Sequence, residues 1–419
     1  MHGNPMKHAV WLAMALGILP MAALAQTGLV QTLEENEATM ATPPMGDQAG
    51  LEAWITAFRP RALAAGVTAP VFDATLRDVQ FDPAIVEKDR NQNEFTKTVW
   101  DYLDTAVSDD RIVLGQNALA ANTDLLARIE AQYGVDAKVV VAVWGLESAY
   151  GTFRGKLPVI ASLATLAYDG RRAEFFEGEL IAALKILQDD HAKPDKFVGS
   201  WAGASGHTQF MPSSWAAFAV DFDGDGRRDI WGDDPADALA STANYLRHWG
   251  WTKGQPWGLE ITLPKGFDYD QTTAAVKKPV AEWQAMGVRP MAGGVLPDHG
   301  PASVLLPGGS RGAAFLIFPN FQVIERYNTA DAYVIGIGHL ADRIADGLPI
   351  KATWPREWRA LTLPERRDLQ DRLTRAGFDA GGVDGRIGPK TIAAVKAFQK
   401  SLGRVPDGYP SPDLLTLLP

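Results

Sequence analysis

The spacing of apolar residues in the first half of the chain is the feature that most limits its fold. From Leu51 onward, apolar side chains recur at helical intervals, as at Trp54 and Phe58, and this spacing continues through about Leu187. Breaks rich in glycine, proline and aspartate, such as Pro83, divide it into separate segments. Helices of this kind bury one face against each other, so the sequence predicts a mainly α fold.

A different texture follows in the second half. Between residues 257 and 321, short β-prone runs at 259–263, 303–306 and 315–318 alternate with glycine and proline. We expect a small β-containing insert there. A helix predicted over residues 330–346 then closes the main domain, and its apolar face is formed by Tyr333, Ile337, Leu340 and Ile344.

The C-terminal segment carries clear helix-boundary signals. Thr362 and Glu365 fit a capping box that opens a helix, and Gly377 lies where that helix should end. A further helix should begin at Pro389, because proline is favourable in a first helical turn. A chain of 419 residues is long for one core. Two folded domains are therefore expected, the main domain at 48–350 and a small three-helix domain at 361–419, joined by a linker at 351–360. Before them we expect a signal peptide at 1–25 and a linker at 26–47.

The N-terminus has the pattern of a secretory signal. Lys7 precedes an uncharged apolar run at residues 9–19, and the small residues of segment 23–25 predict cleavage before Gln26. The chain has no cysteine, which excludes disulfides, thiolate metal sites and a lipid-bearing N-terminal cysteine. We expect a periplasmic protein that is not a lipoprotein and has no membrane anchor.

Charge and aromatic content narrow the class of ligand. Acidic residues outnumber basic ones, 50 to 40, and the formal net charge is -10. This balance disfavours nucleic acid, which needs a concentrated cationic face. The 13 Trp and 9 Tyr residues suit a carbohydrate groove, because flat rings cover sugar faces, although such rings also pack in cores.

One carboxylate stands at the end of a nearly continuous apolar helix predicted within residues 136–151. Burial beside the apolar residues 139–146 would remove water from Glu147 and raise its pKa. A glutamate that stays protonated near neutral pH can act as a general acid. The spacing alone fits a solvated glutamate at a helix end equally well.

Two segments together resemble a known family. Residues 147–151 read Glu-Ser-Ala-Tyr-Gly, and residues 199–214 read Gly-Ser-Trp-Ala-Gly-Ala-Ser-Gly-His-Thr-Gln-Phe-Met-Pro-Ser-Ser. They are similar to the signature of the membrane-bound lytic transglycosylase B family, and the similarity extends over roughly residues 51–348. A motif of this length is far more specific than a short glycine pattern.

The resemblance implies a lysozyme-like helical core in which Glu147 is the only catalytic carboxylate, with no organic cofactor. Enzymes of this family cut the β-1,4 bond between N-acetylmuramic acid and N-acetylglucosamine and leave a 1,6-anhydro sugar. Ordinary glycosidases need two carboxylates. With only one, Glu147 would protonate the leaving oxygen and later accept the proton of the C6 hydroxyl. The alternatives are a hydrolytic muramidase and a non-catalytic scaffold that binds peptidoglycan.

The resemblance also implies substrate-binding residues. Ser200 and Gln209 would hydrogen-bond the sugar or its N-acetyl group, and Phe210 would line the cleft. Arg171 and Arg172 would meet anionic carboxylates of the strand, whereas a surface pair without that role would simply be solvated. The aromatic cleft residues of the family are matched by Tyr245, Tyr327, Tyr333 and, less closely, Tyr102, for each of which burial in the core is the alternative.

A cation-binding pattern starts at residue 221. Carboxylates occupy positions 1, 3, 5 and 9 of a calcium-binding EF-hand loop and glycine occupies position 6, namely Asp221, Asp223, Asp225, Asp229 and Gly226. Arg227 stands at position 7, which contributes a backbone carbonyl in such loops. Position 12 is Gly232 in place of glutamate, and the resemblance implies a longer loop closed by a later aspartate, for which Asp237 fits best. We expect a structural Ca²⁺, and a turn held only by hydrogen bonds is the alternative.

The final domain, residues 361–418, resembles the peptidoglycan-binding domain type 1 of wall enzymes. Its marks are Leu369-Gln370, Val383 to Gly388, Thr391 and Phe398-Gln399. The expected partners are peptidoglycan glycan strands and other cell-wall enzymes, with no nucleic acid among them.

Overall fold

The computed structural model describes residues 46–90, 97–273 and 275–419. The expected signal peptide and all but the last two residues of the first linker lie outside the described residues. In the described ranges, none of the helices combines the length and apolarity needed to cross a membrane. The predicted fold class, mainly α with a small β-containing insert, is confirmed, and the strands form small antiparallel sheets.

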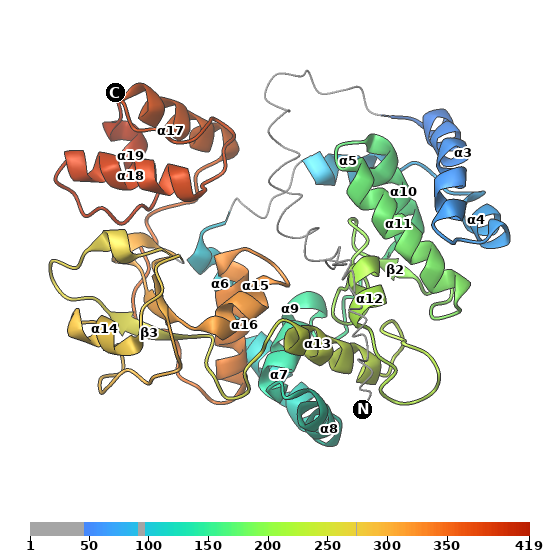
Figure 1. Cartoon of the computed structure of the whole chain (residues 1–419), viewed down its shortest axis with the longest axis horizontal. Coiled ribbons are helices and arrows are strands. Elements are labelled where there is room, and N and C mark those ends of the chain that lie inside the picture. The colour runs from blue at the N-terminus through green and yellow to red at the C-terminus, as the bar shows by residue number, and fades with distance from the viewer. Residues whose placement is uncertain (1–45, 91–96, 274) are drawn as a thin grey trace, which may run out of the picture.

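The main bundle surrounds one buried helix, α9 (Figure 1). All of residues 139–145 in α9 are buried, so the helix packs on every side, against α7, α8, α13 and α16. A second layer is built on the pair α10 and α11. The helices of the bundle are α3 (Gln48–Ala64), α4 (Ala69–Leu76), α5 (Pro83–Arg90), α6 (Val99–Ala106), α7 (Asp109–Ala121), α8 (Thr123–Tyr133), α9 (Ala137–Ser148), α10 (Val159–Asp169), α11 (Ala173–Gln188), α12 (Pro212–Phe218), α13 (Ala236–His248), α15 (Pro319–Glu325) and α16 (Asp331–Ile344).

Two antiparallel sheets complete the main domain. The first pairs β1 (Leu157–Pro158) with β2 (Val198–Gly199). The second has the order β4-β3-β6-β5 and, with the helix α14 and its own apolar core around Trp283, forms the expected insert. Its strands start and end within one residue of the predicted runs, and β4 was not predicted. Their bounds are β3 (Gly258–Thr262), β4 (Arg289–Pro290), β5 (Ser303–Leu305) and β6 (Ala314–Ile317), with α14 at Val280–Ala285 and short 3-10 turns η2 at Tyr269–Gln271 and η3 at Gly309–Arg311.

The C-terminal helices are α17 (Leu363–Arg375), α18 (Pro389–Ser401) and α19 (Pro412–Leu417). The predicted capping box is present, because the Thr362 hydroxyl accepts from the Glu365 N–H while the Glu365 carboxylate accepts from the Thr362 N–H. Gly377 has a positive φ of 90° just beyond α17, as expected for a helix end. The three helices enclose a separate apolar core around Leu369, Leu373 and Val395.

This C-terminal unit lies directly against the β insert (Figure 1). The Lys396 ammonium is buried in the contact, where it donates to the Tyr269 carbonyl at 2.6 Å and to the Thr272 hydroxyl at 3.0 Å. The Asp407 carboxylate accepts from the backbone N–H and hydroxyl of Ser310 at 2.8 and 2.6 Å. Buried polar pairs of this kind fix the orientation of two units, because breaking them leaves polar groups without partners.

We expect Lys396→Met to loosen this contact. The variant loses both hydrogen bonds of the ammonium to partly buried acceptors, which should lower the free energy of unfolding by about 1–3 kcal/mol. In calorimetry, the C-terminal unit should then melt before the main domain, whereas we expect the parent protein to melt in one transition. Lys390→Met, at an exposed position of the same helix, is the matched control. A single unchanged transition in Lys396→Met would contradict a structural role for the contact.

Candidate active site

Glu147 lies in the last turn of α9, where the chain leaves the helix through strained backbone. Ala149 and Tyr150 both have left-handed conformations, with φ of 47° and 57°, and Gly151 follows with φ of 85°. Non-glycine residues with positive φ are uncommon and gather at functional sites. The abrupt exit leaves the Glu147 side chain half-buried at the end of an otherwise buried helix.

Tyr333 of α16 holds one oxygen of this carboxylate. Its hydroxyl donates to Glu147 Oε1 at 2.5 Å. Burial and the nearby charge of Glu147 raise the pKa of Tyr333 well above its usual value, so its hydroxyl keeps its proton. Tyr102 packs beside Leu146 against Gly336 of α16, and so belongs to the same surroundings. The structure thus brings together Glu147, Tyr333 and Tyr102, which the sequence suggested separately.

Three further aromatic side chains, Phe210, Tyr245 and Tyr327, form a cluster of tilted and edge-to-face rings. Phe210 and Tyr327 have ring centroids 5.9 Å apart, and Tyr245 lies 4.9 Å from Tyr327. The Tyr327 hydroxyl donates to the Thr208 carbonyl at 3.2 Å, and burial together with the Glu147 charge raises its pKa well above the usual value. Phe210 and Tyr245 are only 2% and 3% exposed. Both rings pack in the core beside Tyr327, and their predicted role as cleft residues stays a prediction.

Ser200 and Gln209 both lie half-buried on the chain between β2 and α12. The Ser200 hydroxyl accepts from the Ala204 N–H at 3.2 Å. Gln209 has a left-handed backbone, φ 52°, and its amide donates to the carbonyls of Gly206 at 2.9 Å and Arg154 at 3.2 Å. These contacts hold the amide in place by its nitrogen.

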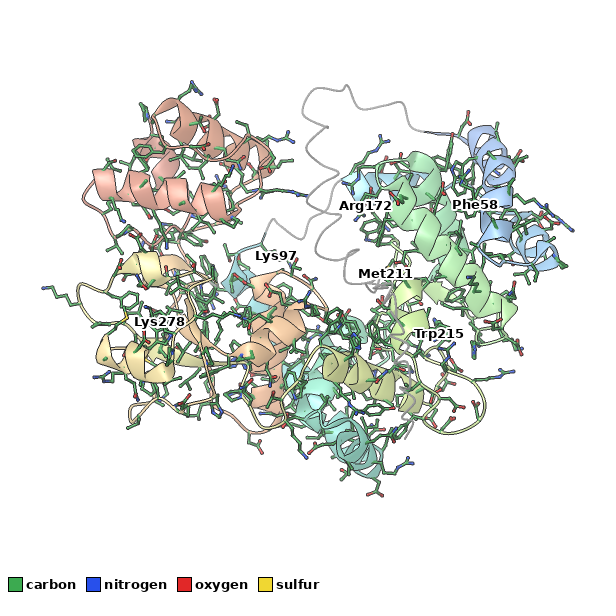
Figure 2. The ribbon with its side chains drawn as sticks, in the orientation of Figure 1. Phe58, Lys97, Arg172, Met211, Trp215 and Lys278 are labelled. Carbon is green, nitrogen blue, oxygen red and sulfur yellow. The ribbon has the colours of Figure 1, made fainter. Side chains whose placement is uncertain are left out.

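Arg171 and Arg172 form a cluster of their own at the start of α11, where Figure 2 labels Arg172. Both bind Asp89, which is 2% exposed, at 2.5 Å and 2.6 Å respectively. Burial works against ionisation of Asp89, yet the two guanidinium groups hold its pKa below the usual value. The pair is therefore anchored by a buried carboxylate, a partner that the sequence did not reveal, and is not a loose solvated pair.

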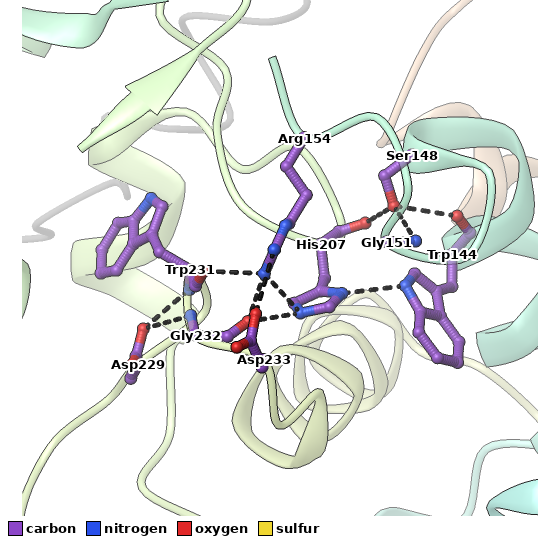
Figure 3. A network of polar contacts seen from close by, with 9 residues as sticks. All are labelled: Trp144, Ser148, Gly151, Arg154, His207, Asp229, Trp231, Gly232 and Asp233. Atoms are coloured by element: carbon purple, nitrogen blue, oxygen red, sulfur yellow. Dashed lines mark hydrogen bonds and ion pairs between the residues drawn. The ribbon is translucent and has the colours of Figure 1, made fainter. Parts of the chain in front are cut away.

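A polar network that sequence reasoning missed ties α9 to the chain around Gln209 (Figure 3). The Ser148 hydroxyl donates to the His207 carbonyl at 2.5 Å and accepts from the Gly151 N–H at 2.9 Å. The Trp144 indole N–H donates to His207 Nδ1 at 3.1 Å. Arg154 donates to the carbonyls of the segment that follows, at residues 231–232. The motif contained Ser148 and His207, but nothing local in the sequence indicates these partners.

The predicted cation loop presents three exposed carboxylates, Asp221, Asp223 and Asp225, whose oxygens lie within 4.8 Å of one another. Each side chain also accepts a backbone N–H from within the loop, as Asp225 does from Arg227 at 2.8 Å. The loop is therefore already folded by its own turns. Such clustered hard oxygens suit Ca²⁺.

Asp237 and Arg227 stand apart from this cluster. Asp237, on α13 and 3% exposed, accepts from the N–H of Phe222 at 2.7 Å and of Asp229 at 2.9 Å. Its carboxylate therefore holds the backbone of the loop against α13. Burial, together with the charge of Asp223, raises its pKa to about 6. The Arg227 side chain binds Asp190 at 3.0 Å, away from the carboxylate cluster. Asp237 is not part of the carboxylate cluster, and the predicted ligand roles of Asp237 and of the Arg227 carbonyl stay predictions.

Comparison with known proteins gives matches over both parts of the chain. The family model described as the transglycosylase SLT domain matches residues 50–342, and that of a peptidoglycan binding domain matches residues 362–418. The membrane-bound lytic murein transglycosylase B of Escherichia coli (strain K12) is 37% identical over 229 residues, which are 53% of this chain and 60% of that protein. The chain thus spans less than two thirds of the length of this relative.

Two solved structures show the likeness of fold. SltB3 from Pseudomonas aeruginosa, in complex with NAG-anhNAM-pentapeptide, is 50% identical with a TM-score of 0.85, and the match covers 88% of this chain and 98% of that one. The lytic transglycosylase Slt35 of Escherichia coli, in complex with calcium, is 29% identical with a TM-score of 0.60, and the match covers 75% and 97%. The family predicted from the sequence is thereby confirmed: the chain belongs to the lytic transglycosylases of the SLT domain family and carries a C-terminal peptidoglycan binding domain.

Proposed function

We propose that the protein is a peptidoglycan lytic transglycosylase that cleaves the β-1,4 bond between N-acetylmuramic acid and N-acetylglucosamine and forms 1,6-anhydro ends. The observation that carries the proposal is the half-buried carboxyl group of Glu147 at the end of α9, held through one oxygen by the Tyr333 hydroxyl. That hydrogen bond fixes the position of Glu147 Oε1 beside α16. Similarity to a protein solved with NAG-anhNAM-pentapeptide supports the choice of substrate.

Glu147 would act twice in the reaction. Its protonated carboxyl group gives a proton to the glycosidic oxygen as the bond to the anomeric carbon breaks. The positive charge developing on that carbon is met by the N-acetyl group of the substrate. The carboxylate, stabilised by the neutral Tyr333 hydroxyl, then accepts the proton of the C6 hydroxyl as its oxygen closes on the anomeric carbon.

Substrate contacts would come from the half-buried polar residues around Glu147. Ser200 and Gln209 would hydrogen-bond sugar and N-acetyl groups, and the Gln209 amide is held by its nitrogen, so its oxygen would be the atom that accepts from a ligand. Arg171 and Arg172, anchored by Asp89, would meet carboxylates of the stem peptide. We further propose that the protein acts on periplasmic peptidoglycan, with the C-terminal domain holding glycan strands and other cell-wall enzymes working on the same polymer.

The chemistry of the new ends tests this function against a hydrolytic muramidase. Purified sacculi are digested and the products are separated before and after borohydride treatment. Anhydro ends cannot be reduced, so the elution of the products should not change. Products that shift after reduction carry reducing ends, and would assign the enzyme to the hydrolases.

We also propose that the carboxylates of Asp221, Asp223 and Asp225 hold a structural Ca²⁺, with Asp237 and the Arg227 carbonyl completing the loop. The exposed cluster supports this, since three like charges so close together favour a cation, and calcium is present in the Slt35 complex. Oxygen-ligated calcium in this loop would supply rigidity, because the loop leads through Asp229 to the segment that Arg154 and His207 bind.

Calcium should therefore raise the melting temperature. At a concentration a hundredfold above its dissociation constant, a ligand of the folded state adds about 2.7 kcal/mol of stability. The double variant Asp223→Asn/Asp225→Asn keeps the side-chain oxygens that hold the turns but loses two charges, so it should gain nothing from calcium. Thermal unfolding in EDTA and in CaCl₂ measures this. An equal rise in melting temperature for parent and variant would show that calcium does not bind at this loop.

A further inference from the structure

His207 is a buried side chain to which the proposed reaction gives no role. It is 4% exposed and lies two residues before Gln209, on the chain that faces the end of α9. Its backbone carbonyl accepts from Ser148, the residue after Glu147, and its ring contacts Trp144, three residues before Glu147. A single residue thus touches the last turn of α9 on both sides of Glu147.

The partners of the ring define its protonation state. An indole N–H can only donate, so Nδ1 of His207 accepts from Trp144 at 3.1 Å. A carbonyl can only accept, so Nε2 carries the proton and donates to Gly232 at 2.8 Å. The ring is therefore neutral and joins two segments through a directed pair of hydrogen bonds.

The surroundings keep the ring in this state. Burial lowers the pKa of His207, the Arg154 guanidinium at 3.3 Å from Nε2 lowers it further, and the Gly232 carbonyl, Asp229 and Asp233 act in the opposite direction. The Arg154 guanidinium donates to the backbone carbonyls of Trp231 and Gly232. A second proton on the ring would turn Nδ1 into a donor facing the Trp144 donor and would break that contact.

Close packing leaves little room for an alternative arrangement. A Cβ on Gly151 would lie 2.6 Å from Nδ1 of His207, so only glycine fits where the chain leaves α9. The Trp144 ring also meets Tyr150 edge to face, with centroids 6.0 Å apart. The position of the His207 ring and the strained exit of α9 therefore depend on each other.

We propose that His207 is a positioning residue, whose ring fixes the last turn of α9, and with it Glu147, relative to Gln209 through the hydrogen bond that Nδ1 accepts from Trp144, while the contact to Gly232 keeps the ring proton on Nε2. This inference rests on the proposed role of Glu147. Proton transfer requires the carboxyl group to meet the glycosidic oxygen at hydrogen-bonding distance, and a displacement of about 1 Å can cost as much as 10²-fold in rate.

Two substitutions test the hydrogen bonds of the two ring nitrogens separately. The amide oxygen of His207→Asn reaches the place of Nδ1 and accepts from Trp144, while the contact to Gly232 is lost. The amide nitrogen of His207→Gln reaches the place of Nε2 and donates to Gly232, while the contact to Trp144 is lost. Trp144→Phe removes the same contact from the other side.

The experiment measures kcat and KM on purified glycan strands, well below the melting temperature of each variant. We expect His207→Gln and Trp144→Phe each to lower kcat by about tenfold with KM within about twofold, and their combination to add little, since both break one contact. His207→Asn should keep kcat within about threefold of the parent. Equal kcat in the Asn and Gln variants, or lowered melting temperatures with unchanged kcat in all, would overturn the proposal.

Failure of the proposed reaction has a different signature. If the parent enzyme released reducing ends, the transglycosylase chemistry would be wrong, yet the comparison of variants on that hydrolytic rate would still test His207. Should His207→Gln not fold, Trp144→Phe against His207→Asn makes the same comparison.

Discussion

Replacing Glu147 by glutamine should lower the rate of glycan cleavage by a factor on the order of 10³ or more, because the amide can neither give nor accept the proton that each half of the reaction transfers. The substitution keeps the size of the side chain, and the amide nitrogen or oxygen can still meet the Tyr333 hydroxyl. Binding of glycan strands and the melting temperature should therefore change little. Loss of turbidity of purified sacculi measures the rate.

Glu179→Gln is the matched control. Glu179 is more deeply buried than Glu147, with 3% exposure, and burial raises its pKa, but its carboxylate accepts from Ser213 at the start of α12 and not from Tyr333. Its replacement should leave the cleavage rate near that of the parent. Equal rates for Glu147→Gln and the parent would show that Glu147 is not the acid, and would favour a scaffold or another catalytic group.

Tyr333→Phe should lower kcat by about 10- to 100-fold and change KM little. The variant removes a single hydroxyl, which donates to Glu147 Oε1, and hydrogen bonds to charged groups contribute about 1.5–3 kcal/mol, where each 1.4 kcal/mol is tenfold in rate. The carboxylate formed after the first proton transfer loses this stabilisation, and its second oxygen loses a fixed direction. Initial rates on isolated glycan strands give both constants.

Tyr133→Phe removes the same atom from a buried tyrosine of α8, whose hydroxyl contacts only Gln132 among the described hydrogen bonds. It should retain the parent kcat, which separates the effect on Glu147 from general loss of a buried hydroxyl. A kcat for Tyr333→Phe that matches Tyr133→Phe would mean that the Tyr333 contact has no part in proton transfer.

Features that depend on neighbouring residues could be predicted from the sequence. The capping box of Thr362 and Glu365 and the helix starting at Pro389 are local, because their hydrogen bonds and dihedral angles involve residues within one turn. The strands of the insert followed from their alternation with glycine and proline. Glu147 was found through its apolar helix and its motif, and its place at the end of α9 is as expected.

Contacts between distant segments could not be predicted in the same way. The hydroxyl that holds Glu147 comes from residue 333, and the carboxylate that anchors Arg171 comes from Asp89. Such partners are set by how helices pack, and their sequence neighbourhoods carry no sign of them. Phe210 and Tyr245 show the same limit, because the sequence fits a cleft residue and a core residue equally well and could not show that both side chains are buried.

The most direct test of the reaction is to digest peptidoglycan in water enriched in heavy oxygen and to weigh the products by mass spectrometry. If Glu147 accepts the proton of the C6 hydroxyl while that oxygen bonds to the anomeric carbon, the muramic ends are lighter than reducing ends by one water molecule and contain no heavy oxygen. Reducing ends that carry heavy oxygen would show that solvent completes the reaction, and would contradict the proposed double role of Glu147.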